Sequence, residues 1–157
     1  MDPSWERYAS FDGAYSFSHP SEWAFEVVPG NTSLFSLSDY AGFATVLLDS
    51  EFSPDRAALG QALIQRLADQ ATRNGDQFQV ITTGVWSSPA AFDNIVVEHL
   101  TIELPQHIPT YHVTLIIATP FRQTLFAQYF RLDSRELAAA ERQMLEAVIA
   151  SLQFAPR

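Results

Sequence analysis

The stretch from Phe92 to Leu132, FDNIVVEHLTIELPQHIPTYHVTLIIATPFRQTLFAQYFRL, carries the pattern that predicts the centre of the fold. It contains three runs rich in Val, Ile, Thr, Phe and Tyr, which are residue types that favour the pleated surface of a β-sheet. Short Pro-containing breaks separate the runs, at 104–109 and at Thr119-Pro120. Because breaks this short join neighbouring antiparallel strands, the stretch predicts a three-stranded meander in the middle of a sheet.

Both faces of the predicted meander carry apolar side chains. In its first strand Val96 and Leu100 share one face, whereas Ile95 and Val97 share the opposite face. A sheet that is apolar on both faces needs cover on both. Together with two predicted helices and about eight strands, this pattern favours an α+β fold, an α/β/α sandwich with a mainly antiparallel sheet.

Two segments have the pattern of amphipathic helices. Ser53-Pro54-Asp55 is typical of a helix start, with Ser at the N-cap and Pro at the first helical position, and Asn74-Gly75 is typical of a helix end. Between them an apolar residue recurs at four-residue spacing, at Leu59, Leu63, Leu67 and Ala71. The second helix is predicted to begin at Asp133 or Ser134. Further strands are predicted at 14–19, 23–28, 34–37, 42–52 and 78–83.

Length and composition indicate one domain. The chain has 157 residues, of which 47% are hydrophobic and 17% charged, so it can close a core. We expect an N-terminal arm at 1–13 and a single domain at 14–157.

The chain contains no Cys, which excludes disulfides and thiolate metal sites. The first residues lack the basic and apolar regions of a signal peptide, so we expect a cytoplasmic protein, or an extracytoplasmic one if a leader was trimmed.

The charge balance argues against polyanionic partners. The formal net charge is -9, and all nine basic residues are Arg spread along the chain. Such a surface repels nucleic acid and anionic membranes. No apolar run approaches the roughly 20 residues that span a bilayer, so we expect no membrane insertion.

No residue pattern points to catalysis, a cofactor or a metal. His99, His107 and His112 are the candidate zinc ligands, but His107 and His112 lie an odd number of positions apart and so face opposite sides of a strand. We interpret them as one loop and two strand histidines with local partners. Asp49 and Glu51 share a strand face and are interpreted as a solvated edge. Nucleophile motifs and Gly-rich phosphate loops are absent from the sequence.

The segment from Trp86 to Phe92 is the candidate partner-binding site. Two large aromatics enclose small residues, and an aromatic on a loop can anchor a partner protein. The alternative is that both side chains pack under the end of the sheet. Trp5 and Tyr8 in the N-terminal arm allow the same two interpretations. Trp23 follows a Pro turn between two strands and is predicted to be a buried anchor.

The stretch Tyr15-Ser16-Phe17-Ser18-His19-Pro20-Ser21-Glu22-Trp23 resembles the opening of the PsbP-like family, in which an aromatic strand meets a Pro turn and then Trp. The closing Ala150-Ser151-Leu152-Gln153-Phe154 is similar to the final segment of that family, so the resemblance spans about Ala14 to Phe154. It implies an α/β/α sandwich shared by photosystem II extrinsic subunits, a nuclear Ran-GTPase-binding protein and bacterial DcrB-like proteins. It also implies a binding or assembly role, because the family has no common catalytic residue.

These observations lead to two functional hypotheses. The first is a non-catalytic protein-binding, assembly or chaperone-like module of bacterial type, whose partner is another protein with a basic face. The second is a small-molecule carrier or a hydrolase, with a pocket between helix and sheet. The sequence leaves the oligomeric state and the identity of partner or ligand open.

Overall fold

The predicted meander forms three adjacent antiparallel strands in a seven-stranded sheet. The computed structural model of the chain describes residues 4–28, 32–38, 40–49, 53–85 and 94–156. Every strand pair in the described sheet is antiparallel. In spatial order its strands are β3 (Ala24–Val28), β4 (Thr32–Ser38), β5 (Ala41–Leu48), β9 (Thr124–Leu132), β8 (Ile108–Ala118), β7 (Asn94–Glu103) and β6 (Gln77–Gly84).

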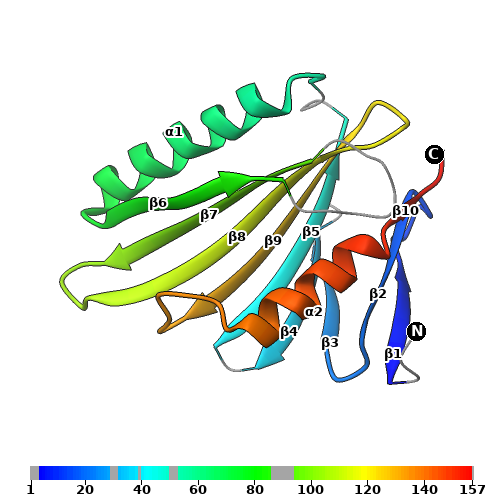
Figure 1. The fold of residues 1–157 in the computed structure, drawn as a ribbon, viewed down its shortest axis with the longest axis horizontal. Coiled ribbons are helices and arrows are strands. Elements are labelled where there is room, and N and C mark those ends of the chain that lie inside the picture. The colour runs from blue at the N-terminus through cyan, green and yellow to red at the C-terminus, as the bar shows by residue number, and fades with distance from the viewer. Residues whose placement is uncertain (1–3, 29–31, 39, 50–52, 86–93, 157) are drawn as a thin grey trace.

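The first helix, α1 (Arg56–Asn74), lies over the β6–β7 end of the sheet (Figure 1). Its start differs from the prediction by two residues. Asp55 is the N-cap, because its carboxylate accepts a hydrogen bond from the Ala58 amide (3.0 Å), while Ser53 Oγ accepts one from the Asp55 amide (3.1 Å). The predicted end is confirmed, since Gly75 adopts the left-handed conformation that closes a helix (φ 75°).

The second helix, α2 (Ala139–Ala150), lies on the opposite face of the sheet. The predicted start at Asp133 or Ser134 is wrong. Asp133 has a positive φ of 58°, which a right-handed helix excludes, and Ser134 Oγ donates to the carbonyl of Glu136 within a turn. The helix therefore begins later, after Ala138, whose side chain cannot cap it.

A second, three-stranded sheet lies beside α2 (Figure 1). It contains β1 (Trp5–Ala9), β2 (Tyr15–Pro20) and β10 (Gln153–Phe154), in the order β1-β2-β10. The segment expected to be an arm thus includes a paired strand, and Tyr8 is buried in the core against Phe17 and Phe35. Across the layers, the Tyr15 hydroxyl and the Thr45 hydroxyl are 2.9 Å apart.

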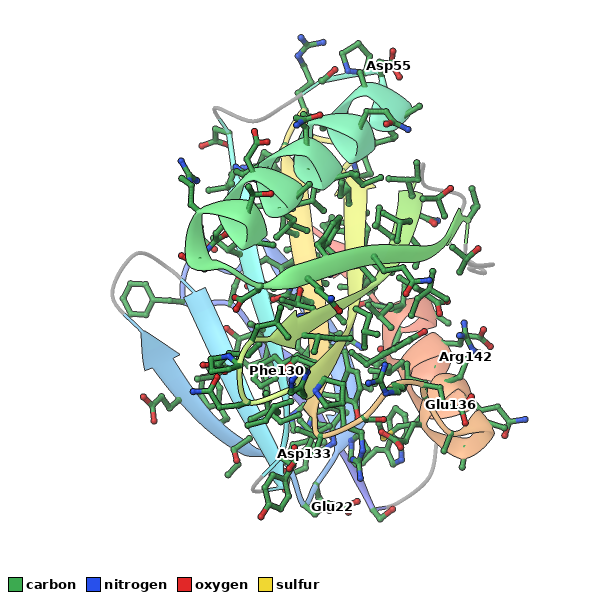
Figure 2. All side chains as sticks on the ribbon, turned by 90° about the vertical axis from the view of Figure 1, so that its left-hand side faces the viewer. Glu22, Asp55, Phe130, Asp133, Glu136 and Arg142 are labelled. Carbon is green, nitrogen blue, oxygen red and sulfur yellow. The ribbon has the colours of Figure 1, made fainter. Side chains whose placement is uncertain are left out.

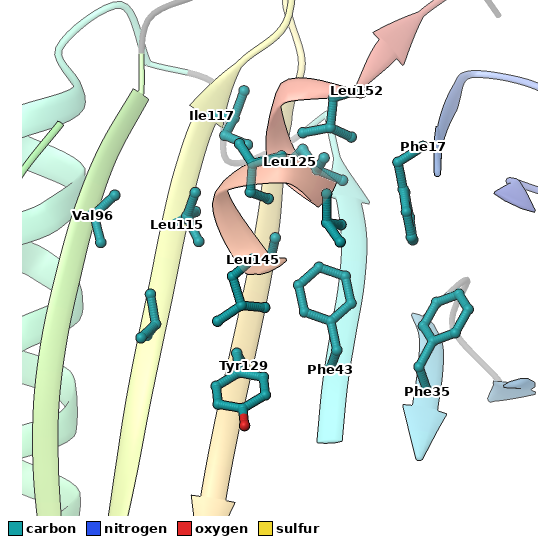
Figure 3. Packing of buried hydrophobic residues seen from close by; sticks show 14 of the residues in the cluster. Phe17, Phe35, Phe43, Val96, Leu115, Ile117, Leu125, Tyr129, Leu145 and Leu152 are labelled. Atoms are coloured by element: carbon teal, nitrogen blue, oxygen red, sulfur yellow. The ribbon is translucent and has the colours of Figure 1, made fainter. Parts of the chain in front are cut away.

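The main core fills the space between the large sheet, α2 and the small sheet (Figure 3). Phe17, Phe35, Phe43 and Leu145 are among its fully buried members. A smaller cluster of Leu63, Val97 and Ile116 joins α1 to the other face. We call the two faces of the large sheet the α1 face and the α2 face. The expected α+β sandwich with a mainly antiparallel sheet is confirmed, and the small sheet shares the α2 face with its helix.

Trp23 has the predicted role of a buried anchor. Only 5% of the residue is exposed. Its indole stacks on the imidazole of His19, with ring centroids 5.6 Å apart, and its centroid lies 5.4 Å from that of Phe43. Burial of such a large aromatic in a ring cluster favours the folded state strongly.

Candidate functional site

The strand β6 forms one border of the large sheet, and its outer edge has no strand partner among the described residues. The strand reads QFQVITTG and contains neither a charge nor a Pro, two of the devices that protect an edge from pairing. Ile81 is 42% exposed, and Val85, which follows the strand, is 71% exposed. A register irregularity between Val80 and Thr82 bends the strand locally.

A groove of about 420 Å³ runs beside this edge. Leu100 and Ile102 of β7 line it together with Gln77, Phe78 and Gln79 of β6. Leu100 and Ile102 belong to the α2 face, where they contact the main core. The edge therefore combines a backbone that pairs with no other described strand and an adjacent hollow that has apolar and amide side chains in its wall.

The predicted contact residues Trp86 and Phe92 lie outside the described residues. The described chain stops at Val85 and resumes at Asn94. Val85 lies at the end of the β6 edge, so the described edge leads directly into the predicted segment. The interpretation of Trp86 and Phe92 as contact residues stays a prediction.

His99 and His112 form a stacked pair on the α1 face, where the strand register places them directly opposite each other. His99 Nε2 lies 3.3 Å from the Thr114 hydroxyl, which also accepts a hydrogen bond from the Gln128 amide (3.0 Å). The Nδ1 atoms of both rings are buried and have no hydrogen-bond partner in the described part of the chain. Burial, together with His112, lowers the pKa of His99 to about 3, and burial lowers the pKa of His112 to about 4.

Of the three histidines considered as zinc ligands, His99 and His112 lie together, whereas His107 lies apart from them. His107 is in the hairpin turn with a positive φ of 58°, away from the other two. Within the described ranges, no group of three His, Asp or Glu side chains is placed to hold a metal ion. The absence of a bound metal stays a prediction. Sequence reasoning missed the stacking, although the hairpin loop at 104–107 is equally far from His99 and His112 and so sets them opposite.

A polar network on the α2 face joins the buried Glu98 and Tyr111 to the partly exposed Arg142. The Arg142 guanidinium donates to both Glu98 carboxylate oxygens, at 2.7 and 2.8 Å, and the Tyr111 hydroxyl donates to the same carboxylate. Burial by itself raises the pKa of Glu98, but the hydrogen bonds from Arg142 and Tyr111 outweigh it and the pKa is lowered. Every member has a partner, so the network serves to attach α2 to β7 and β8.

The two acids proposed to form a solvated edge are only partly described. Asp49 is exposed and accepts a hydrogen bond from the Gln123 amide (2.8 Å), while Glu51 lies outside the described residues. Within the described residues, Asp49 is thus hydrogen-bonded to the loop that contains Gln123.

Sequence comparison finds neither a matching family model nor a matching curated protein. Structure comparison does find proteins with a similar fold. A point mutant of protein Mog1 superposes with a TM-score of 0.64 at 11% sequence identity, covering 97% of this chain and 96% of that one. This chain shares the fold of Mog1. Since identity is so low, the likeness concerns the fold alone.

Two bacterial structures extend the comparison. One from Bacteroides thetaiotaomicron has a TM-score of 0.55 at 17% identity, covering 97% of this chain and 49% of its own. A protein of unknown function from Pseudomonas aeruginosa has a TM-score of 0.52 at 9% identity, covering 98% of this chain and 99% of its own. None of the described helices is long and apolar enough to cross a membrane.

Proposed function

We propose that this chain is a non-catalytic protein-binding or assembly module of bacterial type, and that its partner adds a strand to the β6 edge. The observation that carries the proposal is the β6 edge itself, which is uncharged, lacks Pro and has no strand partner among the described residues. An extended peptide can pair with such an edge through its main chain. The resemblance to a family of binding and assembly factors supports the same role.

The groove beside β6 supplies the specificity that main-chain pairing lacks. In strand addition, alternate side chains of the incoming peptide enter pockets next to the edge. The hollow lined by Leu100 and Ile102 suits an apolar side chain, and Gln77 and Gln79 can hydrogen-bond its neighbours. The net charge of -9 favours a partner segment flanked by Lys or Arg, because complementary charge speeds encounter.

A matched pair of substitutions tests this surface. Ile81→Lys puts a charge on the free edge, whereas Ile108→Lys puts the same charge on another exposed isoleucine, which pairs with Glu103 at the far end of β7. The partner is first captured from the native host, and its Kd is then measured with the purified variants. We expect Ile81→Lys to weaken binding about tenfold or more and Ile108→Lys to change it less than about twofold. If the two folded variants bind the partner with equal affinity, the β6 edge is not the binding surface.

The segment from Trp86 to Phe92 follows the β6 edge in the sequence, and we expect it to contribute to partner binding separately from that edge. Trp86→Ala should mainly speed dissociation, because buried aromatic anchors govern off-rates, while rising salt should slow association. Unchanged dissociation from a folded Trp86→Ala/Phe92→Ala variant would limit the partner surface to the described edge.

A further inference from the structure

A hollow of about 290 Å³ lies on the α1 face, beside the helix. The helix packs against β6, β7 and β8, so the next strands of the sheet, β9 and β5, lie beyond its edge (Figure 1). Side chains of α1, β5, β8 and β9 line the hollow. Its volume is close to the lower end of the range for pockets that bind small organic molecules.

The floor of the hollow is mostly apolar. Val46 and Leu48 of β5 and Phe126 of β9 are half-buried there, and the buried Leu63 of α1 adds to the apolar wall. Val46 and Phe126 are strand partners, so their side chains adjoin on the same face. A ligand that removes this half-exposed apolar surface from water gains about 25 cal/mol for each Å² that it covers.

Arg66 gives the hollow a positive charge. It is the charged residue among the described residues that line the hollow, and it is exposed. No carboxylate in the described part of the chain forms an ion pair with Arg66. The acidic residue of α1, Asp69, accepts a hydrogen bond from the Gln65 amide (2.9 Å). The Arg66 guanidinium is therefore available to an anionic group of a ligand.

The charge and the apolar floor lie close enough together for one small ligand. Leu63 of α1 belongs to the same buried cluster as Ile116, which is the strand partner of Phe126. Arg66 follows Leu63 by three residues, so the two side chains lie on one side of the helix and about 4.5 Å apart along its axis. Successive side chains on one face of a strand are about 7 Å apart, so Arg66 lies within about one such step of Phe126 along the groove. A molecule with one ring and a short chain spans this distance.

We propose that this hollow binds a small organic carboxylate, an acid group carried on a ring or a short apolar chain. The Arg66 guanidinium donates two parallel hydrogen bonds to the carboxylate, and the apolar body covers the floor around Phe126. Gln128, which also lines the hollow, uses one amide hydrogen to bond the Thr114 hydroxyl (3.0 Å) and has a second that can donate to the ligand.

Two features of the chain narrow the ligand class and its relation to the partner surface. The net charge of -9 repels a doubly charged head group such as phosphate more than a singly charged carboxylate. The hollow lies over β5, β9 and β8, whereas the partner surface is at β6, on the border of the sheet. Binding of the carboxylate is therefore independent of the proposed strand addition.

Three probes of equal size test the head group. The intact chain, labelled with ¹⁵N, is titrated with phenylpropionate, phenylpropanol and phenylpropylamine, and amide shifts are followed by NMR. We expect the carboxylate to shift residues of the hollow in a saturable manner, the alcohol to bind about tenfold more weakly, and the amine to produce no saturation there. General attraction to this acidic chain would favour the amine instead. Binding of the alcohol or the amine as tight as that of the carboxylate would overturn the proposal, as would failure of the carboxylate to saturate below about 10 mM.

Matched variants test the location. Arg66→Gln removes the charge from the hollow, whereas Arg73→Gln removes an exposed arginine from the last turn of the same helix, outside the lining of the hollow. We expect Arg66→Gln to weaken phenylpropionate binding about fivefold or more and Arg73→Gln to change it less than about twofold. Equal effects would show a general response to charge and overturn the proposal.

A third variant tests the apolar floor. Val46→Thr keeps the shape of the side chain but replaces a methyl group by a hydroxyl, so we expect phenylpropionate to bind about threefold more weakly. Unchanged binding to folded Val46→Thr would show that the apolar body does not lie on this floor and would overturn the proposal. If Val46→Thr does not fold, the comparison of Arg66 with Arg73 decides, because both arginines are exposed on the helix surface.

Discussion

The imidazole rings of His99 and His112 lie face to face, with centroids 4.5 Å apart and planes inclined by only 9°. Two protonated rings could not stay in this arrangement, because like charges at such a distance inside a protein repel strongly. Burial lowers the pKa of His112 to about 4, and burial together with the neighbouring His112 lowers the pKa of His99 to about 3. The stack therefore makes the α1 face of the folded chain depend on pH.

Acidification should weaken the fold through this pair. Both histidines have their ordinary pKa of 6.5 when unfolded and a lower pKa when folded, so the unfolded chain binds protons first as pH falls. Their contribution to stability is complete above about pH 6.5 and is lost as pH falls toward about 4. We expect the free energy of unfolding to drop by up to about 1.4 kcal/mol per pH unit for each histidine between pH 6 and 5.

Urea unfolding at about pH 7, 6 and 5 measures this slope. The variant His112→Gln removes one ring of the stack and should flatten the slope. His107→Asn, which removes an exposed ring in the hairpin turn outside the stack, is the matched control. Parallel slopes for the parent chain and His112→Gln would contradict the assignment to the stacked pair.

Trp23→Ala should destabilise the chain by about 3–5 kcal/mol, the usual cost of removing a large buried aromatic. The indole contacts His19, Phe35 and Phe43, and the cavity left behind is closed in by these rings. Phe11→Ala is the matched control, because Phe11 is 99% exposed and its loss should cost less than about 0.5 kcal/mol. Chemical denaturation of the two variants gives the comparison, and similar losses would show that Trp23 is not an anchor.

Features that depend on local spacing could be predicted from the sequence. The four-residue spacing from Leu59 to Ala71 and the Gly75 cap defined α1 to within two residues, and alternation defined the meander with its two apolar faces. The start of α2 could not be predicted in this way. Asp133 and Ser134 are good N-cap types, but here one takes a positive φ and the other closes a turn, which only the surrounding structure decides.

The candidate sites depend on contacts between positions far apart in the sequence, so they could be predicted less well than the helices and strands. Arg142 reaches Glu98 across 44 positions, and the approach of α1 to Phe126 creates a groove that no local motif encodes. The position of β6 at the border of the described sheet follows from strand order, which alternation does not determine. The stacked histidines could have been predicted, because the hairpin register alone places His99 opposite His112, but this pairing was missed.

Arg142→Met should destabilise the chain at neutral pH because it leaves Glu98 charged and buried. The side chain of Glu98 is 4% exposed and that of Arg142 is 37% exposed, so the expected loss is about 2–3 kcal/mol, below the range for a fully enclosed pair. The lowered pKa of Glu98 means that the parent gains from this pair above about pH 4.5 and loses that gain as pH falls further. The deficit of Arg142→Met relative to the parent should therefore shrink near pH 4.

Two further variants separate charge from packing. Arg135→Met removes an exposed arginine outside the network and should cost less than about 0.5 kcal/mol. Glu98→Gln/Arg142→Met removes the buried charge along with its counter-ion, so it should be more stable at pH 7 than Arg142→Met alone. A double variant less stable than the single one would show that the carboxylate stabilises the fold without Arg142.

Gly42→Ala should destabilise the parent chain but not a chain that lacks the Phe130 ring. Gly42 of β5 pairs with Phe130 of β9, and a Cβ at position 42 would lie 2.8 Å from Phe130 Cε1 and closer still to Cζ. The Phe130 ring, which Figure 2 labels, would therefore have to move. Against this, Ala restricts the unfolded chain more than Gly and stabilises by up to about 1 kcal/mol where the backbone tolerates it. We expect a net loss of about 1 kcal/mol for Gly42→Ala in the parent, because the displaced ring exposes apolar surface. In a Phe130→Ala background the same change should be neutral or stabilising, since nothing then occupies the space. Unfolding free energies of the four chains form a double-mutant cycle, and a coupling energy near zero would show that the ring does not need the glycine.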